Sequence, residues 1–129
     1  MEFNSLIPEL SVFDIGRTKK FYSELGFKIE YERTEDKFVF MSFQDSQFMF
    51  EQIHDNGWNI GELVYPLGRG INFSIAVDDI EELYKLVNHL NIELYRELTR
   101  NIYQVNGIEE MQIEFLIQDP NGYLLRFTN

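Results

Sequence analysis

The sequence predicts an α+β fold of two similar βαβββ units, and three observations lead to this prediction. Residues 10–15 and 75–80 match at an offset of 65, and the apolar positions after them match at the same offset. In both copies an aspartate precedes a helical pattern, and stretches with the alternating apolar and polar residues of strands follow it. Such self-similarity indicates a repeated structural unit. We therefore expect a curved mixed sheet around a groove, to which each copy contributes one half.

The first unit is expected to span about residues 5–53 of a single domain of 129 residues. Asp14 can accept hydrogen bonds from the unpaired N–H groups at the start of a helix, and Gly26 suits its end. These two residues predict a helix near 15–25. Strands are expected near 6–13, 27–33, 37–43 and 47–53.

The second unit is expected to span about residues 70–129. Asp78 or Asp79 can cap a helix near 79–90 in the same way as Asp14. The run Asp119-Pro-Asn-Gly122 is a turn signature that separates the last two strands. Strands are expected near 70–77, 92–98, 110–118 and 122–128.

Two segments fall outside the repeat, and loops inserted on a repeated scaffold commonly carry ligand contacts. Residues 54–69 are predicted to link the copies. Residues 99–109 are predicted to form a hairpin-like excursion, with Asn106-Gly107 at its turn. The large aromatic residues Trp58 and Tyr103 lie on these segments. They could stack on a flat ligand or pack across a dimer interface, and the sequence favours neither.

Composition limits the kinds of partner. The formal net charge is −11, and the 11 Lys and Arg residues are scattered, so no nucleic-acid partner is expected. The first residues lack the pattern of a signal peptide, and no apolar run approaches the roughly 20 residues that span a bilayer. The absence of cysteine is compatible with a reducing compartment. We therefore expect a cytoplasmic protein without a membrane partner, whose acidity either attracts cationic small molecules or serves solubility.

Alternation along the strands divides their residues into two faces. One face is almost entirely apolar and is predicted to form the core beneath the helices. Its members are Leu10, Val12, Val39, Met41, Phe43, Phe48, Phe50, Ile71, Phe73, Ile75, Val77, Ile113, Phe115, Ile117, Tyr123, Leu125 and Phe127. The other face combines aromatic and polar residues, which is typical of a binding cleft. It carries Phe38, Phe40, Glu51, Asn72, Glu114 and Arg126. Two phenylalanines on a solvated face would be unusual, so we expect a cleft, a dimer interface or both.

Three motifs in register with the repeat resemble the vicinal-oxygen-chelate superfamily, which includes glyoxalases, bleomycin-resistance proteins and dioxygenases. They are Asp14-Ile with Phe21-Tyr22 and Leu25-Gly-Phe27, the run from Gly68 to Ile80, and the ending Gln118-Asp-Pro-Asn-Gly-Tyr123. The resemblance covers essentially the whole chain and is greatest to the bleomycin-resistance branch. It implies paired βαβββ units with a ligand groove.

Metalloenzymes of this superfamily hold their metal through one residue on the first and last strand of each copy. The resemblance places these positions at Ile7, Glu51, Asn72 and Arg126. Only Glu51 is a good ligand for a divalent cation, and a nearby arginine would oppose one. Neither histidine, His54 or His89, is expected to be a ligand, although His54 could approach the mouth of the cleft. We therefore expect no metal and no other cofactor, and Glu51 and Arg126 could pair with each other or with a ligand.

The resemblance implies a small-molecule binding protein that sequesters a cationic and aromatic ligand without chemistry, as a homodimer. The ligand would contact Phe38, Phe40, Glu51, Trp58, Asn72, Tyr103, Glu114 and Arg126. The alternative is an enzyme of the same superfamily, a lyase, isomerase or dioxygenase that uses Glu51 as a metal ligand or as a general base. A third hypothesis is an interaction domain whose cleft is filled by the partner subunit.

Overall fold

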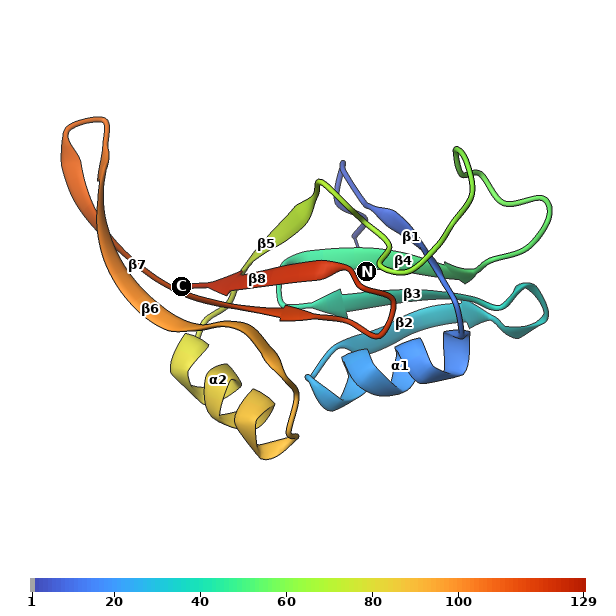
Figure 1. Cartoon of the computed structure of the whole chain (residues 1–129), viewed down its shortest axis with the longest axis horizontal. Coiled ribbons are helices and arrows are strands. Elements are labelled where there is room, and N and C mark those ends of the chain that lie inside the picture. Colours follow the sequence, from blue (N-terminus) through green and yellow to red (C-terminus); the bar gives the residue numbers. More distant parts are fainter. Residues whose placement is uncertain (1) are drawn as a thin grey trace. The chain divides into compact units, whose positions relative to one another are not determined.

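The structure is a computed structural model that describes residues 2–129, and the chain divides into two compact units between Leu67 and Gly68. Within the described residues, each unit consists of one α-helix and one four-stranded mixed sheet, joined in the order βαβββ (Figure 1). The predicted α+β class and the predicted repeat are therefore confirmed. Among residues 2–129, no helix is both long enough and apolar enough to cross a membrane.

The first unit has the strand order β1-β4-β3-β2, with β1 parallel to β4 and the other pairs antiparallel. A short 3-10 turn, η1, joins β2 to β3. The elements are β1 (Glu9–Val12), α1 (Ile15–Glu24), β2 (Lys28–Arg33), η1 (Thr34–Asp36), β3 (Phe38–Phe43) and β4 (Ser46–Gln52).

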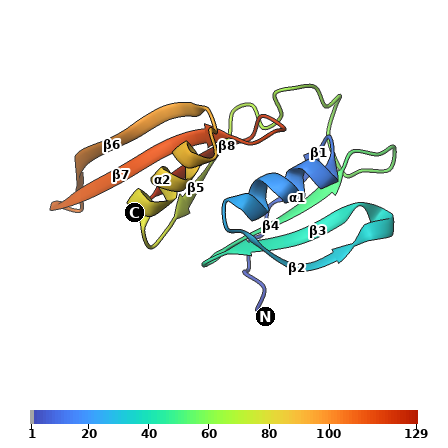
Figure 2. The same cartoon turned by 90° about the horizontal axis from the view of Figure 1, so that it is seen from below.

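Helix α1 begins and ends at the residues that the sequence indicated. Asp14 accepts a hydrogen bond from the backbone N–H of Arg17 at 3.0 Å, and this bond satisfies a donor that the helix itself cannot pair. Gly26 follows the helix with a φ of +106°, a conformation that suits glycine. Figure 2 shows α1 lying along one face of its own sheet, so this helix leaves the opposite face of that sheet uncovered.

The core of the first unit lies between α1 and the sheet. The predicted strand residues Leu10, Val12, Val39, Met41, Phe48 and Phe50 are all buried, as is Tyr22 of the helix. The Tyr22 ring lies 4.5 Å from that of Phe50 and 5.0 Å from that of Phe27, measured between ring centroids. Phe43 is only half-buried and stacks on Phe27 at the edge of this core.

The second unit repeats this plan with the strand order β5-β8-β7-β6, in which β5 is parallel to β8. Asp79 caps α2 through the backbone N–H of Glu82 at 3.1 Å. In the turn before β8, the buried carboxylate of Asp119 accepts hydrogen bonds from the backbone N–H groups of Asn121 and Tyr123. The elements are β5 (Asn72–Ala76), α2 (Ile80–His89), β6 (Leu94–Val105), β7 (Ile108–Gln118) and β8 (Leu124–Thr128).

Strands β6 and β7 are longer than predicted. Residues 99–109, which we expected outside the strands, form the outer part of one long hairpin, because β6 and β7 stay paired as far as Val105 and Ile108. Asn106 and Gly107 make its turn with φ values of +53° and +80°. Strand β8 pairs with β7 only from Glu114 onward, so the outer hairpin extends as a two-stranded arm (Figure 1).

The core of the second unit lies between α2 and its sheet. Ile75, Val77, Phe115, Ile117, Tyr123, Leu125 and Phe127 are buried as predicted, together with Ile80, Leu83 and Val87 of the helix. Phe73 and Ile113 are half-buried. The prediction for Ile71 was wrong, since its side chain is 49% exposed. Ile71 precedes β5, so it lies outside the pleated segment on which the alternation depends.

Candidate ligand-binding site

The open face of the first sheet carries two rows of side chains that run across all four strands. Backbone register places Ser11, Glu51, Phe38 and Arg33 opposite one another, and we call this row the charged rung. The adjacent row contains Glu9, Met49, Phe40 and Tyr31. Because directly opposite residues share a face of the sheet, both rows project to the side away from the core.

A cavity of about 460 Å³ lies over these rows, which is within the size range of small-molecule sites. Of the predicted site residues, Glu51, Phe38 and Trp58 line it. The other lining residues are Glu9, Ser11, Tyr31, Arg33, Met49, His54 and Asn56. The cavity therefore combines two carboxylates, one guanidinium and several aromatic side chains.

Phe38 and Phe40 are not exposed as we expected, because only 3% and none of their surfaces, respectively, are accessible. The ring of Tyr31 lies 5.4 Å from that of Phe40 and 5.9 Å from that of Phe38, and Phe3 lies 5.3 Å from Phe40. Arg33 lies over the Phe38 ring with its Cζ atom 4.0 Å from the centroid. Neighbours on β2 and in the N-terminal segment thus cover both rings. Phe40 does not line the cavity, and these two rings no longer argue for dimerisation.

Glu51 is held in place by His54. The Nε2 atom of His54 lies 2.8 Å from Oε1 of Glu51, and the backbone N–H of Asn56 donates to Nδ1 of the same ring at 3.2 Å. A backbone N–H can only donate, so Nδ1 carries no hydrogen and Nε2 is the donor to the carboxylate. This network orients Glu51 through one of its two oxygens.

Arg33 is anchored on the opposite side of the charged rung. Its Nε atom lies 3.3 Å from Oδ2 of Asp36, in a pair whose two side chains are about half exposed. A guanidinium has five N–H donors, and this contact uses the one on Nε. Its contact with the Phe38 ring holds the guanidinium in the cavity wall.

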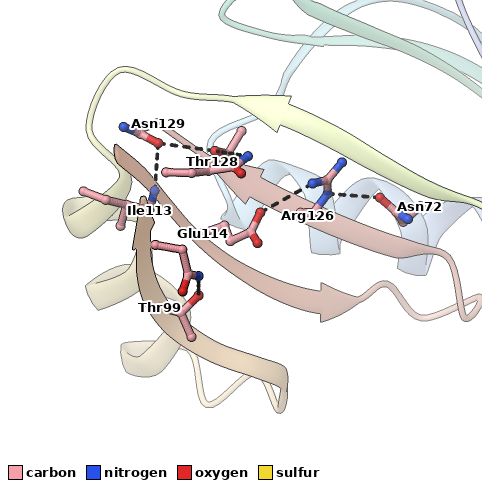
Figure 3. Close-up of polar contacts among 9 residues, drawn as sticks. Asn72, Thr99, Ile113, Glu114, Arg126, Thr128 and Asn129 are labelled. Carbon is pink, nitrogen blue, oxygen red and sulfur yellow. Dashed lines mark hydrogen bonds and ion pairs between the residues drawn. The ribbon is translucent and has the colours of Figure 1, made fainter. Parts of the chain in front are cut away.

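In the second unit, the structure brings together three of the predicted residues. Arg126 of β8 donates from Nε to Oδ1 of Asn72 at 3.1 Å, and its Nη1 lies 3.5 Å from Oε2 of Glu114 (Figure 3). Glu114 is the better shielded of the ion pair, with 16% of its side chain exposed. Glu51 and Arg126, which we considered as a pair, each have a partner within their own unit.

The residues at the four metal-ligand positions do not fit a divalent metal. Ile7 is apolar, and Asn72 is hydrogen-bonded to the permanently charged guanidinium of Arg126. Within residues 2–129, no group of three or more His, Asp or Glu side chains is placed to hold a metal ion. Glu51 alone has suitable chemistry, and His54 takes one of its oxygens.

The two aromatic residues predicted from the inserted segments, Trp58 and Tyr103, differ in their settings. Trp58 lines the cavity and is almost fully exposed. Tyr103 lies within β6, opposite Glu110 on the outer hairpin, and is not among the residues that line the cavity. His54 lies in the cavity wall, whereas His89 is exposed at the end of α2.

Sequence reasoning missed Tyr31 and Arg33 for a physical reason. The register between β2 and β3 shifts between Ile29 and Tyr31, where one extra residue, Glu30, is inserted. Strict alternation from Ile29, which is opposite Met41 of the core face, would place Tyr31 and Arg33 on the helix side. The bulge brings them onto the open face instead, and no glycine or proline in β2 signals it.

Two βαβββ units, each with a helix on one sheet face and polar groups on the other, define a class of paired-module α+β domains. The family model described as "Glyoxalase/Bleomycin resistance protein/Dioxygenase superfamily" matches residues 5–127. A solved member of that superfamily from Vibrio splendidus 12B01 shares 36% identity over 93% of each chain, with a TM-score of 0.44. The match of the family model over nearly the whole chain shows that the chain belongs to the Glyoxalase/Bleomycin resistance protein/Dioxygenase superfamily.

Other solved structures are similar at lower identity. A glyoxalase/bleomycin resistance protein/dioxygenase from Alicyclobacillus acidocaldarius shares 26% identity over 97% of this chain and 89% of its own, with a TM-score of 0.67. A bleomycin resistance determinant encoded on the transposon Tn5 shares 21% identity over 98% of both chains, also with a TM-score of 0.67. The second likeness shows the common fold alone. A search of curated proteins found no match.

Proposed function

We propose that this protein binds a small molecule with cationic and flat aromatic parts and sequesters it without chemistry. The observation that carries this proposal is the cavity of the first unit, where the oriented carboxylate of Glu51 lies beside Tyr31 and Trp58. A carboxylate attracts a cation, and aromatic faces bind both cations and flat rings. The family includes bleomycin-resistance proteins, so antibiotic sequestration in the cytoplasm is the form of this function that we propose.

The charge of the chain supports a cationic ligand. A net charge of −11 raises the local concentration of cations and repels polyanions such as nucleic acids. Glu9 adds a second carboxylate to the cavity beside Glu51. In the second unit, the polar groups Asn72, Glu114 and Arg126 form a separate candidate ligand surface.

The experiment is a calorimetric titration of metal-stripped protein with a bleomycin-family compound, with Trp58 fluorescence followed in parallel. We expect saturable binding at one ligand per subunit with a change in Trp58 emission, because that side chain lines the cavity. Glu51→Gln keeps the size of the side chain and removes its charge, and it should weaken binding about tenfold or more. Binding that Glu51→Gln leaves unchanged would contradict this assignment of the site.

Catalysis is the second candidate function, and the Glu51–His54 pair is the observation that favours it. A carboxylate held at 2.8 Å from an imidazole resembles the arrangements that orient a general base, and Glu51 is also the one suitable metal ligand among the four family positions. Metal analysis of the purified protein discriminates the candidates. Stoichiometric metal that Glu51→Gln abolishes would favour a lyase, isomerase or dioxygenase over sequestration.

A further inference from the structure

We propose that the cavity of the first unit selects a zwitterionic ligand, with its cationic group at Glu51 and an anionic group at Arg33. This inference rests on the proposed function. It adds that the ligand also carries a negative charge, and it assigns each of the two charged groups of the ligand to one side chain of the cavity. It starts from the charged rung, in which Glu51 and Arg33 flank Phe38 on one sheet face.

The distance between the two charges suits one small molecule. Glu51 is on β4 and Arg33 is on β2, with β3 between them. Neighbouring strands are roughly 4.8 Å apart, so the two backbone positions are separated by roughly 10 Å. A single aromatic ring with a charged substituent at each end has the dimensions to reach both side chains from the cavity.

The two charges do not neutralise each other, because each has its own anchor. Glu51 is hydrogen-bonded to the ring of His54, and Arg33 is held by Asp36 and lies over the ring of Phe38. Oppositely charged groups held apart on one wall form an electrostatic pattern that a ligand of complementary polarity fits. The apolar stretch between the charges, with Met49 and Tyr31 in the adjacent row, suits the uncharged middle of such a ligand.

Arg33 retains the capacity to bind an anion. Its contact with Asp36 engages Nε, and the guanidinium still has N–H donors on both terminal nitrogens. Exposed pairs such as Arg33–Asp36 contribute little to stability, so a ligand carboxylate can share or displace the contact. A purely anionic ligand, by contrast, would meet a chain of net charge −11 and two cavity carboxylates. The pattern therefore favours a molecule with both charges over one with a negative charge alone.

The test uses three probes on the full chain: benzamidine, 4-amidinobenzoate and benzoate. They share one phenyl ring and carry the cation alone, both charges, or the anion alone. We expect 4-amidinobenzoate to bind about fivefold more tightly than benzamidine, the gain of one partly exposed charged contact, and benzoate to bind most weakly. Affinities are measured from shifts of backbone amide signals in NMR titrations, which report weak binding and locate it.

Variants assign the charged ends. Arg33→Gln should abolish the advantage of 4-amidinobenzoate over benzamidine, whereas Arg33→Lys should keep part of the advantage, because the charge remains and the planar fork is lost. Arg17→Gln is the matched control, since it removes one positive charge from the exposed surface of α1 in the same unit. An unchanged amide spectrum of each free variant shows that the sheet is intact.

The outcomes separate this inference from the proposed function. If 4-amidinobenzoate binds no better than benzamidine, or if Arg33→Gln keeps its advantage, the zwitterion inference is wrong while a cationic ligand still stands. If none of the three probes shifts the cavity signals, the inference is also wrong, and the bleomycin titration then decides the proposed function by itself.

Discussion

At the scale of single residues, the position of Glu51 depends on one histidine. His54 donates to its carboxylate and is itself oriented by the backbone of Asn56. We predict that His54→Ala weakens binding of a bleomycin-family compound about fivefold, the effect of losing a hydrogen bond of about 1 kcal/mol. His54→Gln, which can still donate, should recover part of this loss in the same titration.

The control for this prediction is the other histidine. His89 is exposed at the end of α2, outside the cavity lining, so His89→Ala should leave the affinity unchanged. Both His54 variants should unfold at the same urea concentration as the wild type, because His54 is exposed. Equal affinity for wild type and His54→Ala would show that Glu51 needs no orientation by the ring.

Gly68 supports a second prediction at this scale. Its φ is +73°, and a Cβ atom there would lie 2.4 Å from Cδ1 of Tyr123, which is buried. Gly68→Ala therefore combines a strained backbone with a clash against a core ring, and we expect it to lower the free energy of unfolding by about 3 kcal/mol.

Gly70 is the matched control for Gly68. It also has a positive φ, of +84°, but a Cβ atom there would meet nothing within 4 Å. Gly70→Ala should cost about 1 kcal/mol from backbone strain alone. Urea denaturation compares the two variants. Equal destabilisation would mean that Tyr123 moves aside and that the close approach has no structural role.

The residue scale is also where the sequence was least informative about the site. Glu51, Phe38 and Trp58 could be assigned to a cleft because alternation and loop position are visible in the sequence. Arg33 and Tyr31 could not, because the bulge in β2 reverses their face. The burial of Phe40 likewise depends on Phe3, a residue 37 positions earlier whose contact no local pattern indicates.

At the scale of elements, the repeat predicts the strands and helices well but not how their turns are stabilised. Asp45 and Asp119 occupy matching positions before the last strand of each copy. Asp119 is buried, and its carboxylate accepts three hydrogen bonds, from the backbone N–H groups of Asn121 and Tyr123 and from the side chain of Asn121. Asp45 is exposed, and its backbone carbonyl bonds to the side chain of Asn4.

This difference gives a prediction about turn stability. Asp119→Ala leaves buried N–H groups unsatisfied, so it should lower the free energy of unfolding by about 3 kcal/mol. Asp45→Ala removes the same group from an exposed turn and should cost less than about 0.5 kcal/mol. Denaturant unfolding monitored by circular dichroism measures both. Similar losses in the two variants would show that the two turns are equivalent in energy as well as in sequence.

At the scale of the whole molecule, the repeat and the charge were both evident from the sequence, but the surface that we propose for assembly was not. We expected dimerisation from Phe38 and Phe40, and the structure buries both. One group of exposed apolar residues lies on the outer β6–β7 hairpin, with members on both strands. They are Ile102, Tyr103, Val105, Ile108 and Met111. Alternation could not assign them, because a two-stranded arm beyond β8 has no helix to define an inner face.

These residues carry our prediction for the oligomeric state. An apolar two-stranded arm is a liability in a monomer, so we expect a homodimer that buries it. Ile108 and Met111 lie on opposite faces of the arm, as the register of β6 and β7 requires. If one face is the interface, Ile108→Glu or Met111→Glu, but not both, should shift sedimentation at micromolar concentration from dimer to monomer.

Ile60→Glu is the control, because Ile60 is equally apolar and fully exposed on the segment between β4 and β5. A wild-type chain that sediments as a monomer at this concentration would exclude the hairpin interface, and loss of the dimer in Ile60→Glu would place the interface on that segment instead.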